Sequence, residues 1–239
     1  FVSIQNCLRS GIQEKVGRTG TNKKANKLEN CTLKLLTDFV KIYDECLAPS
    51  LCDKIINAFE ADDEHHIESK IGALNEPIFR ETDGKVNVYR HAIEMNCTKR
   101  ATESPKWDGI MRLLNHHASS YFQKYCSELK DGGFPFNMYE ETRLEQWRMH
   151  RYNPNKHYYK EHIDSIEYYS AQRMLVMLYY LNTVEEGGET KFATIDTAVK
   201  PVKGRLAIAP TWFGYPHSAE IPITESKYMI KTFVHYPRV

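Results

Sequence analysis

Residues 173–192 read RMLVMLYYLNTVEEGGETKF, and this stretch decides the fold. Its apolar run at residues 174–181 has the character of a strand, and residues 190–192 predict a second strand after a hairpin turn at Gly187-Gly188. Strand-like runs of the same kind recur in the second half of the chain, at residues 144–152, 158–163, 205–209 and 228–235. Many short strands separated by turn signals favour an antiparallel barrel or a double-sheet jelly roll.

The first half of the chain predicts helices that cover one outer face of these sheets. One helix opens where Ser50 supplies a cap, and a longer one follows Ser104. The longer helix carries an apolar stripe from Trp107 to Leu129 at spacings of three and four residues, which indicates packing against a core. Two further segments have strand character, residues 39–43 and 86–95. The expected fold class is therefore mainly β with flanking helices: a double-stranded β-helix (jelly roll) core buttressed by N-terminal helices.

The domain organisation follows from a change in composition near residue 35. Residues 1–34 hold seven basic residues against two acidic ones and show no hydrophobic periodicity, so we expect a basic N-terminal extension. A solvated arm and a docking arm for an acidic partner both fit them. Residues 35–239 suit one domain. Within it, the polar stretch 62–86 is long for a plain connection and predicts a lid or binding loop.

Composition excludes several classes of function. The formal net charge of +1 gives no general attraction to nucleic acid or to anionic lipid. No run of 18 apolar residues occurs, so we expect no membrane span. The six cysteines stop at Cys126, and a chain of this length needs no disulfide staples. We therefore favour a reduced, cytoplasmic protein, although Asn30 and Asn96 begin the three-residue glycosylation pattern that often arises by chance.

Two histidines and an aspartate form the candidate site. His162 and Asp164 are two residues apart, so on a strand both side chains point to the same face. If a distant strand brings His217 to them, the two imidazoles and the carboxylate form a facial triad that leaves positions open on iron(II). Lys227 follows ten residues after His217 and supplies a positive charge for a dicarboxylate cosubstrate. On its own a His-x-Asp pair occurs often by chance, and the rest of the pattern makes it informative.

With these residues in place, the chain resembles the prolyl 4-hydroxylase branch of the iron(II)/2-oxoglutarate-dependent dioxygenases. The resemblance spans roughly residues 143–236 and, more loosely, residues 36–130. Its clearest part is residues 173–192, because a string that ends in Gly-Gly-Glu-Thr-x-Phe is typical of that branch. The resemblance implies that residues 35–239 are a double-stranded β-helix oxygenase domain.

The resemblance also assigns roles to individual residues of this chain. It implies three iron ligands, which are His162, Asp164 and His217. It implies four residues of the 2-oxoglutarate pocket, with Lys227 on the distal carboxylate of the cosubstrate: Lys227, Tyr152, Tyr180 and Thr190. It implies three residues near the substrate: Tyr159, Arg173 and Trp212.

The implied activity is hydroxylation by O2, coupled to oxidative decarboxylation of 2-oxoglutarate to succinate, with ascorbate as the reductant. The first candidate substrate is a prolyl residue in a peptide or protein, and a free amino acid or another side chain is the alternative. Two departures from peptide-hydroxylating relatives keep this open: the short link from Asp164 to Arg173, and Lys231-Thr232-Phe233-Val234 where collagen-type members usually carry a Trp. A non-catalytic jelly-roll binding module is the competing class. A nucleic-acid demethylase lacks its basic groove signature in residues 35–239.

Overall fold

The computed structural model describes residues 36–71, 81–82, 85–86, 90–134 and 142–236. The predicted basic extension lies outside these ranges and stays a prediction. Within the proposed lid at residues 62–86, residues 72–80 and 83–84 lie outside them, and the role of this segment as a lid stays a prediction. Among the described helices, none is both long and apolar enough to cross a membrane.

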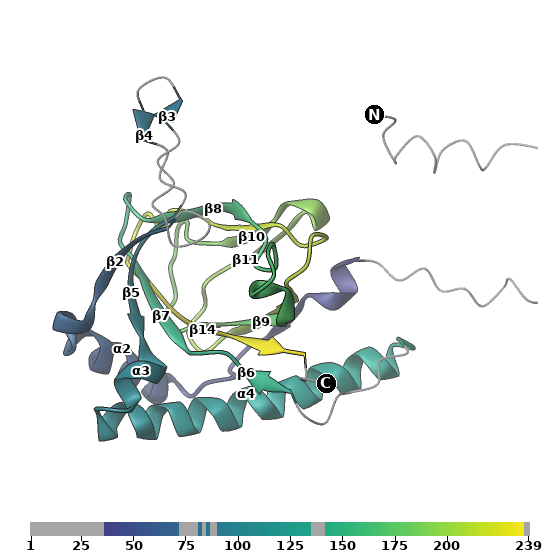
Figure 1. Cartoon of the computed structure of the whole chain (residues 1–239), viewed down its shortest axis with the longest axis horizontal. Helices are drawn as coiled ribbons and strands as arrows, with labels where there is room; N and C mark the ends of the chain where they lie inside the picture. Colours follow the sequence, from purple (N-terminus) through teal and green to yellow (C-terminus); the bar gives the residue numbers. More distant parts are fainter. Residues whose placement is uncertain (1–35, 72–80, 83–84, 87–89, 135–141, 237–239) are drawn as a thin grey trace, which may run out of the picture. The chain divides into compact units, whose positions relative to one another are not determined.

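Strands β7 to β14 build two facing layers (Figure 1). One layer has the order β12-β9-β14-β7 and the other the order β8-β13-β10-β11, with antiparallel pairing in both. Their bounds are β7 Arg148–Tyr152, β8 Tyr158–His162, β9 Arg173–Tyr180, β10 Thr190–Phe192, β11 Thr197–Val199, β12 Leu206–Pro210, β13 His217–Ala219 and β14 Lys227–His235. The chain changes layer at each connection except the β10–β11 hairpin. This is the predicted double-stranded β-helix, and the fold class is confirmed.

Further strands extend and close the barrel. β5 pairs with β7 of one layer and with β8 of the other, so it joins the two layers at one side. β1 adds to β12, β2 to β5 and β6 to β14, whereas β3 and β4 pair only with each other. Their bounds are β1 Lys41–Tyr43, β2 Ile67–Ile71, β3 Glu81–Thr82, β4 Lys85–Val86, β5 Arg90–Asn96 and β6 Arg143–Leu144. The predicted strand at residues 39–43 is thus shorter, because a 3-10 turn occupies Leu36–Phe39.

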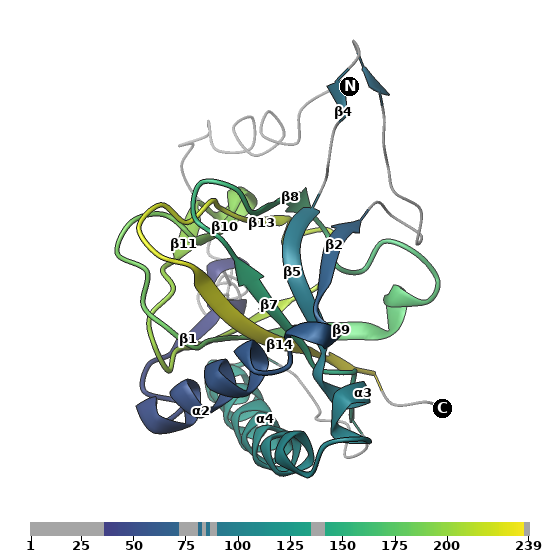
Figure 2. The ribbon, with the colours of Figure 1, turned by 90° about the vertical axis from the view of Figure 1, so that its left-hand side faces the viewer.

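The helices cover the outer face of the β12-β9-β14-β7 layer (Figure 2). Helix α4, Pro105–Asp131, packs there through the predicted stripe, in which Trp107, Leu114 and Leu129 are buried. Helix α2, Pro49–Glu60, lies beside it, and the short helix α3 spans Cys97–Ala101. Short 3-10 turns complete the described elements: η2 Asp63–His65, η4 Ser170–Gln172 and η5 Ala193–Ile195.

Two local predictions about the helices and turns are wrong. Ser50 does not cap α2, because the helix begins earlier, with Pro49 in its first turn and Ala48 at the N-cap. Gly187-Gly188 does not form a hairpin, because β9 and β10 lie in different layers. Instead, both glycines have positive φ angles in the crossover, and Gly187 bridges to Pro222.

Two apolar clusters explain the uninterrupted run of β9. One fills the space between the β9 layer and the helices, and it includes Met177 and Tyr179. The other fills the barrel between the two layers, and it includes Val176, Leu178 and Tyr180. Alternate side chains of β9 therefore enter two cores, so both of its faces are apolar and no polar alternation appears in the sequence.

We predict that Gly187→Ala destabilises the fold by about 1–3 kcal/mol. The φ angle of Gly187 is 78°, and a Cβ atom there would lie 2.3 Å from the carbonyl oxygen of Ile221. Gly109→Ala is the matched control, because Gly109 lies in α4 and a Cβ atom there would meet no other atom within 4 Å; it should stabilise by about 0.4–1 kcal/mol. Urea denaturation measures the stability of both variants, and equal unfolding midpoints would contradict the need for glycine at position 187.

Candidate metal centre and cosubstrate pocket

Three side chains converge where β8 ends and β13 begins. His162 is the last residue of β8 and lies opposite His217, the first residue of β13. Asp164 follows two residues after His162; its Oδ1 lies 3.6 Å from Nε2 of His162 and its Oδ2 lies 3.2 Å from Nε2 of His217. The potential ligand atoms of all three lie within 4.8 Å of one another. The triad thus consists of the cross-strand pair His162 and His217 and of Asp164, which follows the end of β8.

Backbone carbonyls fix the tautomer of both imidazoles. Nδ1 of His162 lies 2.9 Å from the carbonyl oxygen of Lys160, and Nδ1 of His217 lies 3.1 Å from that of Tyr215. A carbonyl oxygen only accepts, so each Nδ1 carries a proton, and in the neutral imidazole each Nε2 is left with a lone pair on the side of Asp164. This arrangement is the one in which metal-binding histidines are held.

The electrostatics of the triad call for a cation. Nε2 of His162 and Oδ2 of Asp164 are buried and have no hydrogen-bond partner among the described residues. Burial and the neighbouring His217 lower the pKa of His162 to about 4. Burial alone would raise the pKa of Asp164, but Lys231 and His217 outweigh it and hold this pKa well below its ordinary value. Acceptors that face each other without a proton repel, whereas two nitrogens and one oxygen suit a divalent metal such as iron(II).

A second group of potential ligands consists of Glu68, His91 and His157. Nδ1 of His157 accepts a hydrogen bond of 3.0 Å from the backbone N–H of Asn153, so its Nε2 carries the proton and offers no lone pair. Nε2 of His91 already contacts Glu68 at 2.6 Å, and Nζ of Lys156 lies 3.5 Å from the same carboxylate. Nε2 of His157 is buried without a hydrogen-bond partner among the described residues, but a protonated nitrogen cannot bind a metal and the carboxylate of Glu68 is already paired, so the triad is the better candidate.

A buried lysine lies in the barrel with the other predicted pocket residues. Lys227 is the first residue of β14, is fully buried and lies opposite Tyr152 of β7. Its Nζ donates to the carbonyl oxygen of Gly188 at 2.7 Å and lies 5.0 and 5.8 Å from the ring centroids of Tyr152 and Tyr180. The hydroxyl of Tyr180 donates to Oγ1 of Thr190 at 2.8 Å. The structure therefore brings all four of these residues together.

Burial of Lys227 is costly without an anionic partner. It lowers the pKa of Lys227 to about 7, although the more distant carboxylates of Glu189 and Glu220 raise it. Within the described part, the carbonyl of Gly188 is the one hydrogen-bond acceptor of this ammonium group. An ammonium group with spare N–H bonds in an apolar, tyrosine-lined interior suits a carboxylate ligand.

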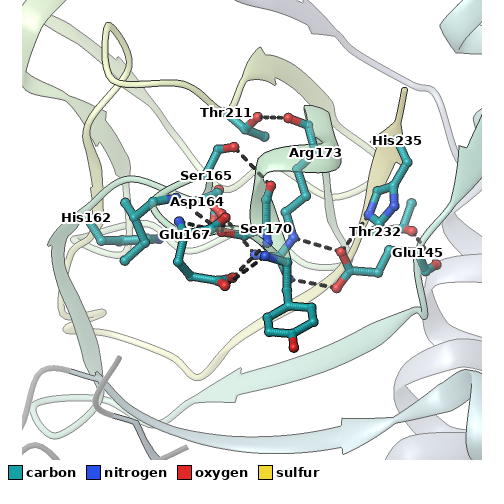
Figure 3. A network of polar contacts seen from close by, with 12 residues as sticks. Glu145, His162, Asp164, Ser165, Glu167, Ser170, Arg173, Thr211, Thr232 and His235 are labelled. Carbon is teal, nitrogen blue, oxygen red and sulfur yellow. Dashed lines mark hydrogen bonds and ion pairs between the residues drawn. The ribbon is translucent and has the colours of Figure 1, made fainter. Parts of the chain in front are cut away.

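Arg173 holds the loop that carries Asp164 (Figure 3). Its Nη1 donates to the carbonyl oxygen of Asp164 at 3.0 Å, and its Nε and Nη2 donate to the carboxylate of Glu145 at 2.7 and 2.8 Å. In the same loop, Glu167 accepts the backbone N–H of Ser170 at 2.7 Å. These bonds order the short link between Asp164 and Arg173. A substrate contact by Arg173 stays a prediction, because its guanidinium group is engaged in positioning Asp164.

Two other predicted substrate residues lie close to the triad in sequence. The ring of Tyr159 stacks on that of His162 with a centroid distance of 3.5 Å, which supports the imidazole from one face. Trp212 is 39% exposed and packs edge-on against Phe213 and Tyr215 in the segment before His217. Their roles toward a substrate stay predictions.

Sequence reasoning missed two charged residues beside the triad, Glu145 and Lys231. Glu145 precedes β7 and gave no signal, because its contact with Arg173 joins segments 28 residues apart. Lys231 could have been found, since residues two and four apart on a strand share a face and Lys227 was already assigned to the interior.

We predict that His162→Ala abolishes metal binding while the fold persists, because the triad sits in a preformed barrel and two ligands leave too few donors. Cobalt(II) absorption and calorimetry measure the binding, and circular dichroism measures the fold. His157→Ala is the matched control and should retain the metal. Retention by His162→Ala together with loss in His157→Ala would assign the metal to the other histidine group.

Comparisons with known proteins agree with this geometry. Residues 147–235 match the family model of the 2OG-Fe(II) oxygenase superfamily. No curated protein matches the chain. One similar solved structure is a viral collagen prolyl hydroxylase from Paramecium bursaria Chlorella virus-1, with 20% identity, a TM-score of 0.52, and coverage of 82% of this chain and 95% of that chain. A Pseudomonas putida prolyl-4-hydroxylase has 14% identity, a TM-score of 0.53, and coverage of 84% of this chain and 97% of that chain. A Trichoplax adhaerens prolyl hydroxylase has 16% identity, a TM-score of 0.55, and coverage of 83% of this chain and 84% of that chain.

At these identities the solved structures establish the fold, and the family match covers the strands from β7 to β14 that carry the triad and Lys227. Residues 147–235, which make up less than half of the chain, are therefore similar to the 2OG-Fe(II) oxygenase superfamily, and the geometry of the triad and of Lys227 lies within this matched part.

Proposed function

We propose that this protein is an iron(II)- and 2-oxoglutarate-dependent hydroxylase of a peptide or protein, with a prolyl residue as the first candidate target. The proposal rests on the presence of a candidate metal-binding triad and a candidate carboxylate-binding lysine inside the same barrel. The triad offers three potential ligand atoms within 4.8 Å of one another, and Lys227 offers a buried ammonium group. The fold family pairs this type of triad with a 2-oxo acid that carries a second carboxylate.

Each set of residues has a separate task in this proposal. His162, Asp164 and His217 would hold iron(II), which when bound supplies the activation of O2 with 2-oxoglutarate as electron donor. Lys227 would bind the distal carboxylate of 2-oxoglutarate. The apolar barrel interior excludes water from the reacting groups, which limits side reactions.

Support for a peptide target comes from the fold and from exposed aromatic side chains. The Trichoplax structure contains a peptide fragment of a hypoxia-inducible factor degradation domain. In this chain, Tyr168 and Tyr169 of the β8–β9 loop and Phe213 of the β12–β13 loop are largely exposed. Both loops adjoin metal ligands, and aromatic side chains are frequent in surfaces that bind peptides. A free amino acid is the alternative substrate.

A non-catalytic binding module is the competing function. Such a module needs no buried ammonium group, and burying one without a ligand costs stability. We expect purified protein with iron(II), ascorbate and 2-oxoglutarate to release succinate slowly without substrate and faster with a prolyl peptide. An absence of succinate together with an absence of 2-oxoglutarate binding by calorimetry would favour the binding module.

We predict that Lys227→Met weakens 2-oxoglutarate binding by about 3–5 kcal/mol, because the cosubstrate carboxylate would lose its buried partner. The same change should stabilise the ligand-free protein by about 1–4 kcal/mol, since an apolar side chain of similar volume replaces a desolvated charge. Calorimetry and thermal unfolding measure the two effects. Lys191→Met is the control, because Lys191 pairs with Glu220 at the surface and should change neither. A loss of both affinity and stability in Lys227→Met would indicate general unfolding.

Binding of 2-oxoglutarate should also depend on pH through Lys227. The ligand needs the charged lysine, and its carboxylate raises the pKa of Lys227 above the value of about 7 in the ligand-free protein. Above that pH the free lysine is neutral and binding takes up a proton, so affinity should fall by up to about tenfold per pH unit; below it, affinity should be flat. Calorimetry at pH 8 in buffers of different ionisation enthalpy measures the proton uptake, with Lys227→Arg as the control that removes it.

A further inference from the structure

Strand β14 places a second lysine inside the barrel. Lys227, Met229, Lys231 and Phe233 alternate along β14 and share one face. Met229 and Phe233 belong to the apolar cluster between the two layers, and Lys231 is 8% exposed. Lys231 and Lys227 are four residues apart, which is about 13 Å along a strand. The backbone positions of the two lysines are therefore well separated along β14.

Lys231 lies beside the metal triad. Its charge lowers the pKa of both Asp164 and His162. Its Nζ lies 5.0 Å from the ring centroid of Phe233, and no acceptor in the described part of the chain hydrogen-bonds to it. Lys231 is thus a largely buried residue whose ammonium group has no acceptor in the described part of the chain, and such a group suits an anionic ligand.

The carboxylates around Lys231 are committed elsewhere. Asp164 and Glu94 are the carboxylates that act on Lys231, and Glu94 accepts hydrogen bonds from Arg90 and Arg148. Asp164 is the remaining counter-charge, and a metal ion in the triad would take its oxygens. Lys231 is then the buried cation in this part of the barrel that has no partner among the described residues.

His150 adds a second unsatisfied group to the same region. It is fully buried on β7, and neither ring nitrogen has a hydrogen-bond partner in the described structure. Across the β7–β14 ladder His150 lies opposite Met229, and Lys231 lies opposite Arg148, so His150 and Lys231 are diagonal neighbours on one face. Burial holds the pKa of His150 well below its ordinary value, and Lys231 is among the charges that lower it further. A neutral imidazole has one N–H to donate. Nδ1 of His150 lies 3.8 Å from Oε2 of Glu94, which is beyond hydrogen-bond distance, so Lys231 and His150 together offer N–H donors that no described group accepts.

We infer that Lys231, assisted by His150, binds a carboxylate of the substrate, so that the carbon to be oxidised lies close to an acidic group. The inference rests on the proposed function and narrows its substrate class: a peptide with Asp or Glu next to the target residue, or a free α-carboxylate. The alternative ligand for Lys231 is the cosubstrate itself. A metal in the triad would hold the near carboxylate of 2-oxoglutarate, and the experiment below separates the two ligands by comparing the 2-oxoglutarate affinities of Lys231→Met and Lys227→Met.

The test measures binding to full-length protein loaded with manganese(II) and 2-oxoglutarate. A library of capped pentapeptides, randomised at every position, is passed over immobilised protein, and the retained peptides are read by mass spectrometry. We expect Asp and Glu to be enriched at least tenfold over Asn and Gln at one position on the wild type. The enrichment should disappear with Lys231→Met and persist with Lys231→Arg. N-acetyl-aspartate and its neutral diamide, titrated by calorimetry, give the same comparison for a small ligand.

The outcomes separate this inference from the proposed function. Equal retention of acidic and amide peptides by the wild type, or no retention of any acidic probe, overturns the inference. So does an acid preference that survives in Lys231→Met. A loss of 2-oxoglutarate affinity in Lys231→Met as large as that in Lys227→Met also overturns it, because Lys231 would then hold the cosubstrate. If the wild-type protein did not bind 2-oxoglutarate at all, that result would instead contradict the proposed function.

Discussion

The alignment of His162 with His217 across β8 and β13 is the constraint on which the rest of the structure depends. A shift of one residue in either strand would turn one imidazole to the opposite face of the layer. The register changes immediately after this pair, between His217 and Ala219, as an irregularity of the β8–β13 ladder. Such irregularities re-aim side chains beside functional sites. The Nδ1 contacts to Lys160 and Tyr215 then fix the ring planes, so the local backbone sets both the position and the tautomer of the ligands.

Charged groups buried inside the barrel lower the stability of the folded protein. Lys227, Lys231, Asp164 and Glu94 are all buried, and each ion costs several kcal/mol to desolvate without full compensation. Glu94 is compensated by two arginines, whereas the two lysines have few or no acceptors of their own among the described residues. The apolar clusters on either side of β9 supply the stability that tolerates these charges. Ligands that neutralise the lysines should therefore stabilise the protein as they bind.

Much of the fold could be predicted because β9 and β12 are apolar on both faces and α4 carries a long periodic stripe. The triad could be predicted because His162 and Asp164 are two residues apart. Strands β11 and β13 are only three residues long, so their sequences show no alternation of apolar and polar residues that would predict a strand. They form because they pair with neighbouring strands of the sheet, not because of local propensity. The same limit applies to Arg173: its place on β9 was predictable, but its bonds to Glu145 and to the Asp164 carbonyl depend on segments distant in sequence.

The order of charges along β14 connects the fold to the choice of substrate. One face of a single strand presents Lys227 at its start and Lys231 four residues later, with Met229 between them. A straight strand keeps such groups at a fixed separation, so two anions bound to them are held at a set spacing with the triad in the same interior. A hydroxylase for an uncharged target needs only the first of these cations. Retaining the second one, buried and without an acceptor in the described structure, is a cost that folding alone does not explain.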